Sequence, residues 1–120
     1  MKKLSPLDKF GKFMMQNFRD KGIHFAKGLL AQQSKAPDLQ ELQNVLSTLT
    51  EVQKDAVIKT ITETIDRAMH DFLFALQEQA DFDNEIQILV DEQNVVELSD
   101  GIHGEAYSDD GWIAKHSQHK

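Results

Sequence analysis

The stretch that decides the fold runs from Thr50 to Ala80 and reads TEVQKDAVIKTITETIDRAMHDFLFALQEQA. Its apolar residues recur at steps of three and four, a spacing that places side chains on one side of an α-helix. They are Val57, Ile61, Ile65, Ala68, Phe72 and Leu76, flanked by Ile58, Met69 and Leu73. Thr50 and Gln53 have the spacing of a capping box, in which each side chain bonds the other residue's backbone. The pattern predicts a long helix that begins after Thr50 and ends near Gln79 or Ala80.

An earlier amphipathic stretch leads up to this helix. Ser5 followed by Pro6 favours a helix start, because serine caps a first turn and proline suits its first position. The apolar residues that follow form one predicted stripe: Leu7, Phe10, Met14, Phe18, Phe25 and Leu29. Gly22 interrupts this stripe and weakens a helix by about 1 kcal/mol. Residues 6–33 are therefore either one long helix or two, and we favour a break or bend near Gly22.

The pattern changes after residue 80. Residues 85–90 (EIQILV) and 94–98 (NVVEL) are short and rich in β-branched side chains, which is typical of strands. The residues between them can form the turn of a hairpin. Residues 112–115 (WIAK) form either a third short strand or a docked tail. The last third of the chain is therefore predicted to be a small antiparallel sheet.

Together these segments predict an α+β fold in a single domain that spans residues 1–120. Three or four helices, one of them a short helix after Asp38, make up the helical part over residues 5–80. A hairpin or a three-stranded sheet makes up the small β part over residues 85–116. Because a two-stranded hairpin is marginal alone, we expect it to pack on the helices.

The composition excludes several classes of protein. The chain has no cysteine, which rules out disulfide scaffolds, cysteine nucleophiles and thiolate metal sites. Its formal net charge of −7 argues against nucleic-acid binding. No stretch approaches the roughly 20 apolar residues that span a bilayer, and Asp8 and Lys9 interrupt any signal-peptide core. We therefore expect a cytoplasmic protein that binds neither nucleic acid nor membranes.

The charge is unevenly distributed along the chain. Residues 1–35 hold eight lysines or arginines and only two acidic residues, whereas residues 71–110 hold twelve acidic residues and no lysine or arginine. Such asymmetry is a hint of an interaction surface. The alternative is that the basic N-terminal helix packs near the acidic segment within one fold.

Five polar residues near the C terminus form the best candidate cluster for chemistry. They are Asp100, His103, Glu105, Asp109 and Asp110. Histidine and carboxylates ligate divalent metals, and Glu105 could act as a general base toward a bound water. Turns are naturally rich in aspartate and glycine, however, so the spacing is unspecific. We assign no catalytic residue, no metal and no cofactor from it.

Several segments carry a resemblance. They read RDKG at residues 19–22, KAP at 35–37, HDFLFALQE at 70–78, LSDGIHGE at 98–105 and GWIAK at 111–115. The chain resembles a group of small bacterial proteins that share a helical N-terminal region and an SDG-x-HGE…GWIAK ending. Because no activity is known for that group, the resemblance implies no site residues. It implies a bacterial, cytosolic protein.

Three functions remain open on these observations. The favoured one is a non-catalytic protein-binding module, whose docking surface is either the acidic segment or the aromatic N-terminal helix. The candidate contact residues on the acidic side are Asp91, Glu92, Glu97 and Trp112. An immunity-type protein that covers the basic active site of a toxin nuclease is a specific case. The alternatives are a small metal-binding protein or hydrolase that uses His103 and Glu105, and a structural homo-oligomer.

Overall fold

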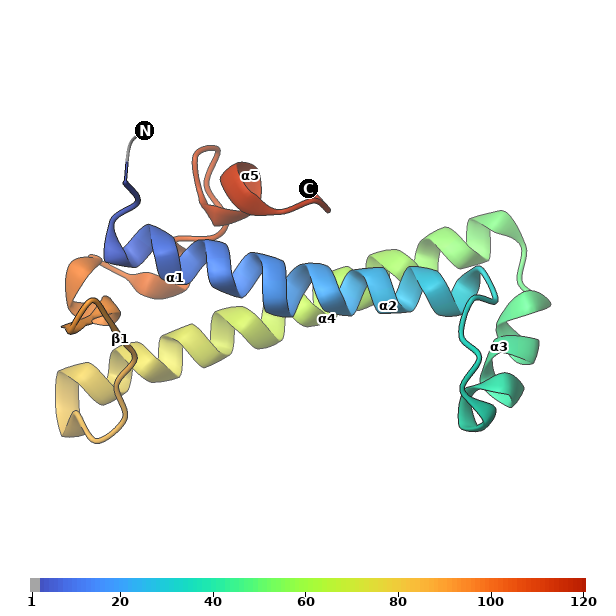
Figure 1. The fold of residues 1–120 in the computed structure, drawn as a ribbon, viewed down its shortest axis with the longest axis horizontal. Helices are drawn as coiled ribbons and strands as arrows, with labels where there is room; N and C mark the ends of the chain where they lie inside the picture. Colours follow the sequence, from blue (N-terminus) through green and yellow to red (C-terminus); the bar gives the residue numbers. More distant parts are fainter. Residues whose placement is uncertain (1–2) are drawn as a thin grey trace.

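The computed structural model describes residues 3–120 and consists of a long helical hairpin with a smaller C-terminal segment packed on it (Figure 1). The first arm comprises α1 (Pro6–Met14), a π-helical turn (Met15–Arg19) and α2 (Asp20–Leu30). A turn at Pro37–Leu39 leads into the short helix α3 (Gln40–Ser47) at one end of the molecule. The second arm is α4 (Glu51–Glu78), which runs back along the first arm (Figure 1).

The first arm is one continuous helix, so the break favoured near Gly22 is absent. Ser5 caps its start by accepting a hydrogen bond from the Asp8 amide at 3.2 Å, as the sequence predicts. Gly22 lies inside α2, where a Cβ would come within 2.8 Å of Ile65 Cδ1 on α4. The glycine therefore lets the two arms approach closely and does not end the helix.

The irregularity lies earlier, in the π-helical turn, and it changes which side chains face the core. A π-helical turn holds one more residue than an α-helical turn, so the inward side moves by one position. Phe10 and Met14 are buried as predicted. From the end of the turn onward the buried residues are Arg19, Asp20, Ile23, Ala26 and Leu30. The predicted stripe residues Phe18 and Phe25 are instead 51% and 54% exposed.

The second arm begins with the predicted capping box. The Thr50 amide donates to Gln53 Oε1 at 2.9 Å, and the Gln53 amide donates to Thr50 Oγ1 at 3.1 Å. The buried residues of α4 are Met69, Leu73 and Leu76. After Glu78 the helix continues as a π-helical turn (Gln79–Asp83), which ends at Asn84 in the left-handed conformation.

The predicted sheet is present but much smaller than expected. It is a two-stranded antiparallel hairpin, β1 (Leu89–Val90) and β2 (Gln93–Asn94), with Val90 opposite Gln93. Residues 95–98 were expected to be strand, but they form a 3-10 turn. The Asn94 side chain accepts the Val96 amide at 3.2 Å and so bends the chain out of the extended conformation.

The end of the chain packs onto the first arm as a helix. Residues Trp112–His116 form α5, which lies beside α1 (Figure 1) and is not a third strand. Trp112 is 1% exposed and meets Phe10 edge to face at 5.7 Å between ring centroids. The core lies here, between α1, the second half of α4 and the C-terminal segment. The fold class is thus α+β, mainly helical with a small antiparallel sheet.

Candidate functional site

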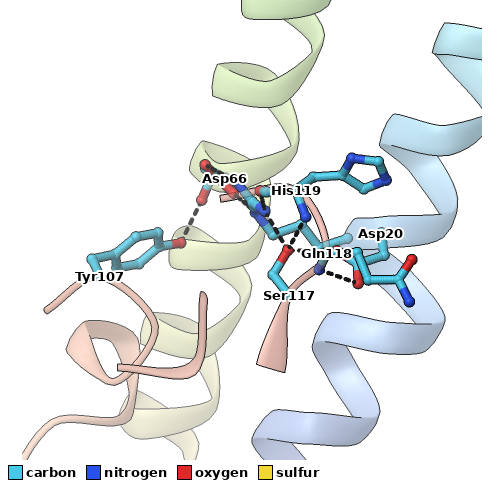
Figure 2. A network of polar contacts seen from close by, with 7 residues as sticks. Asp20, Asp66, Tyr107, Ser117, Gln118 and His119 are labelled. Atoms are coloured by element: carbon cyan, nitrogen blue, oxygen red, sulfur yellow. Dashed lines mark hydrogen bonds and ion pairs between the residues drawn. The ribbon is translucent and has the colours of Figure 1, made fainter. Parts of the chain in front are cut away.

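The most extensive polar network in the described part of the chain is centred on Arg19. The π-helical turn directs this side chain inward, where only 3% of the residue is exposed. Its guanidinium pairs with the Asp66 carboxylate of α4 through two contacts, Nε to Oδ1 at 2.7 Å and Nη2 to Oδ2 at 3.2 Å (Figure 2). A two-point pair of this kind fixes both the distance and the orientation of the helices.

The same network holds the last residues of the chain. Arg19 Nη1 donates to Ser117 Oγ at 2.9 Å and also to the His119 carbonyl oxygen. Ser117 Oγ donates in turn to Asp20 Oδ1 at 2.6 Å, and the Gln118 amide donates to Asp20 Oδ2 at 3.0 Å (Figure 2). Both carboxylates and the guanidinium thus have partners, so this network fastens residues 117–119 to the hairpin.

Tyr107 adds a further tie to α4. Its hydroxyl donates to the Asp66 carbonyl oxygen at 2.7 Å (Figure 2). Burial of the phenol, and then the nearby Asp66 carboxylate, raises the pKa of Tyr107 to about 12. The hydroxyl therefore keeps its proton at neutral pH and acts as a hydrogen-bond donor, not as a base.

The five candidate residues for metal or hydrolytic chemistry differ in their surroundings. No three or more histidine and carboxylate side chains within residues 3–120 are grouped so that they could hold a metal ion. His103 packs edge-on against His70 and Phe74 of α4, with ring centroids at 5.4 and 5.1 Å. Asp110 accepts from Ser108 Oγ at 3.1 Å. The side chains of Asp100, Asp109 and Asp110 are exposed, and that of Glu105 is half-buried.

The four candidate contact residues have different surroundings. Glu92 and Glu97 are exposed, as a docking surface requires. Asp91 is exposed too, but it pairs with Lys9 of α1 at 2.7 Å, and this hydrogen bond lowers the pKa of the Asp91 carboxyl. Trp112 must be withdrawn from the set, because its indole is buried in the core and cannot meet a partner.

More phenylalanines are exposed than the apolar periodicity of the helices predicts. Only Phe10 is buried; the other six of the chain's seven phenylalanines are 45–80% exposed. Large aromatic side chains on a surface are a common mark of protein interfaces. An interleaved set of exposed apolar and acidic residues follows α4, at the end of the hairpin opposite α3 (Figure 1). We call it the acidic end surface: Asp81, Phe82, Asp83, Glu85, Ile86, Leu89, Glu92, Glu97 and Asp100.

Comparisons with known proteins give no match. No protein-family model matches the chain, and neither a curated protein nor a solved structure is similar to it. The resemblance to small bacterial proteins with the SDG-x-HGE…GWIAK ending therefore stays a prediction. None of the helices in residues 3–120 has both the length and the apolar character needed to cross a membrane.

Proposed function

We propose that this chain is a non-catalytic protein-binding module of the bacterial cytosol and that it docks its partner through the acidic end surface. The observation that carries the proposal is the mixture of side chains there. Phe82 is 80% exposed, and Ile86 and Leu89 are each 60% exposed. Acidic residues precede and follow these three in the sequence. Exposed apolar side chains supply affinity when they are covered, and charges beside them select the partner.

The charges of this surface favour a partner with a cationic surface. The described residues contain no ion pair for any acidic member of this surface, whereas the neighbouring Asp91 has one with Lys9. Unpaired carboxylates attract cationic surfaces and accelerate encounter with them. The proposed partner is therefore a protein whose surface combines lysine or arginine with an apolar pocket. The basic active site of a toxin nuclease has this chemistry, so an immunity-type role is the specific case that we propose.

No group of three or more histidine and carboxylate side chains among residues 3–120 could hold a metal ion, so no observation favours the metal-binding alternative. His103 packs edge-on against the rings of His70 and Phe74. We therefore advance no second function from this cluster.

Affinity capture from a bacterial lysate with three forms of the full chain tests the proposal. The test variant is Glu85→Lys/Glu92→Lys/Glu97→Lys. The matched control is Glu41→Lys/Asp55→Lys/Glu63→Lys, which changes the net charge equally at exposed sites on α3 and α4. We expect wild type and control to retain the same protein at about 0.1 M salt and to retain less of it near 1 M, where the charge contacts are screened.

The decisive result is the difference between the two triple variants. The proposal predicts that the test variant fails to retain that protein at any salt concentration, and that Phe82→Ser weakens retention as well. Equal capture by the test variant and the control would overturn it. Cross-links between the captured protein and residues outside 81–100 would do the same.

A further inference from the structure

Apolar side chains also lie along one uncovered side of the helical hairpin, away from the acidic end surface. On α4 they are Ile61, Ile65, Ala68 and Phe72, spaced by four, three and four residues. On the first arm they are Phe18 and Phe25, seven residues apart. Ile65 faces Gly22, which lies four residues after Phe18 and three before Phe25. This contact joins the two rows into one surface, which we call the apolar seam.

The seam lies on the side of α4 opposite the one the C-terminal segment covers. That segment contacts α4 through Asp66, His70, Phe74 and Gln77. Successive residues of an α-helix are rotated about its axis by ~100°. By this measure the mean direction of these four contact positions is about 165° from the mean direction of the four seam residues of α4. The C-terminal segment therefore leaves the seam uncovered.

The same holds for the first arm. The tail contacts α2 through Asp20 and Lys27, and these positions lie on the opposite side of that helix from Phe18 and Phe25. Phe18, Phe25 and Phe72 accordingly remain 49–54% exposed, and Ile61 and Ile65 are half-buried.

The chain exposes more surface than a compact monomer of its size. The chain exposes 8079 Å², whereas a folded monomer of its mass exposes about 6,600 Å². Its radius of gyration is 17.2 Å, against about 13.6 Å for a compact domain of this length. The excess of about 1,500 Å² is larger than the roughly 800 Å² that each partner buries in a standard interface. The elongated chain therefore exposes enough additional surface to accommodate a dimer interface of standard size.

We infer that the apolar seam is the interface of a two-fold homodimer, in which two hairpins form a four-helix bundle. In a two-fold interface the same patch meets itself. With the axis along the helices, α2 of one copy packs against α4 of the other. Helical hairpins with one apolar side can complete a bundle core in this way. This inference is independent of the proposed partner, because the acidic end surface and the seam share no residue.

The mass of the full chain in solution, measured by sedimentation and light scattering over a range of concentrations, tests the dimer. We expect a dimer that persists at about 1 M salt, since screening weakens exposed charge pairs but not apolar contacts. The variant Phe18→Ser/Phe72→Ser should dissociate at least about 100-fold more readily. The control Val52→Ser/Phe82→Ser removes two exposed apolar side chains outside the seam and should stay dimeric.

A second variant protects the test against misfolding. Ala68→Arg places a charge in the seam at an exposed position and leaves the buried residues unchanged, so it should give a monomer with the helical circular dichroism of wild type. A wild-type monomer up to about 100 μM would overturn the inference, because a dimer held by an interface of standard size should form below that concentration. Dimers that persist in Ala68→Arg, or that dissociate in high salt, would overturn it equally.

Discussion

Gly11 on α1 lies directly beneath the indole of Trp112, so close that a Cβ at residue 11 would overlap the ring. The missing side chain is what allows α5 to pack on α1 with the tryptophan fully buried. Residue 11 is thus a contact position as well as a helical one, and the two roles make opposite demands on its side chain.

Gly11→Ala should destabilise the fold although alanine is the better helix former. Helix propensity alone would stabilise α1 by about 1 kcal/mol, but overpacking against a fixed indole costs about 1–3 kcal/mol. We expect a net loss in the free energy of unfolding from urea titration. Gly28→Ala is the matched control, because a Cβ there meets only Gln33 Oε1 at 3.6 Å and should be neutral or stabilising. Equal effects at both glycines would contradict the packing argument.

Arg19→Met should be among the most destabilising single substitutions. It removes the buried partner of Asp66 and two of the contacts that hold residues 117–119, at a cost of about 3 kcal/mol. Arg67→Met on the exposed side of α4 breaks only a 3.9 Å contact to Asp71 and should cost less than about 0.5 kcal/mol. Urea unfolding of both variants measures the difference, and similar midpoints would refute the assignment.

Stability should fall as the solution is made acidic, beginning near pH 6.5. Burial, and then the neighbouring lysine, lowers the pKa of both His116 and His119 below that of free histidine. Below about pH 6.5 the unfolded chain therefore binds more protons than the folded chain, and stability drops until the lower folded pKa is passed. Above pH 6.5 these groups contribute no pH dependence.

The His116→Gln/His119→Gln variant tests this pH dependence. Its urea midpoint should change less than that of wild type between about pH 7.5 and about pH 5.5. Asp91, whose pKa is lowered by Lys9, adds a loss only at more acidic pH, near the usual carboxyl range. A variant that loses as much as wild type in the upper window would show that other groups are responsible.

Deletion of Asn17 should be tolerated, which is unusual for a residue inside a helix. The π-helical turn holds one residue more than a regular turn, so removing an exposed residue there can restore an α-helix while the flanking buried residues keep their orientation. The exposed Thr64 lies in a regular part of α4, where there is no extra residue to remove. Its deletion should therefore rotate Met69 and Leu73 out of the core. Thermal melting of both deletions gives the comparison. Unfolding of both proteins would contradict it.

The regular part of the fold could be predicted from the sequence because local chemistry specifies it. The Thr50–Gln53 capping box and the long helix depend on neighbours within one or two turns, and both are confirmed. The π-helical turn could not be predicted from the sequence. Phe18 and Phe25 continue the apolar spacing of a regular helix, so the sequence gives no reason to expect that Ile23 and Ala26 are buried in their place. Only packing against α4 selects the alternative in which Arg19 faces inward.

The structure of the C-terminal third is also difficult to predict from the sequence, because it too depends on contacts that are not local. β-branched residues predict strands, but only four residues pair, because Asn94 redirects the chain with its own side chain. The sequence around Trp112 does not predict its burial. The space for the indole is provided by Gly11, about a hundred residues earlier in the chain. For the candidate polar cluster, the sequence gives no indication of side-chain orientation: His103 packs edge-on against His70 and Phe74 of α4.

The position of Ser117 has a consequence for the order of folding. During synthesis Arg19 and Asp20 leave the ribosome almost a hundred residues before the serine that joins them, and the hairpin partner Asp66 arrives between the two events. In a hairpin formed before Ser117 is synthesised, one side of the Arg19, Asp20 and Asp66 side chains must remain hydrated until residues 117–119 emerge. The charged centre of the hairpin can therefore lose its last contact with water only when the three residues 117–119 dock on it.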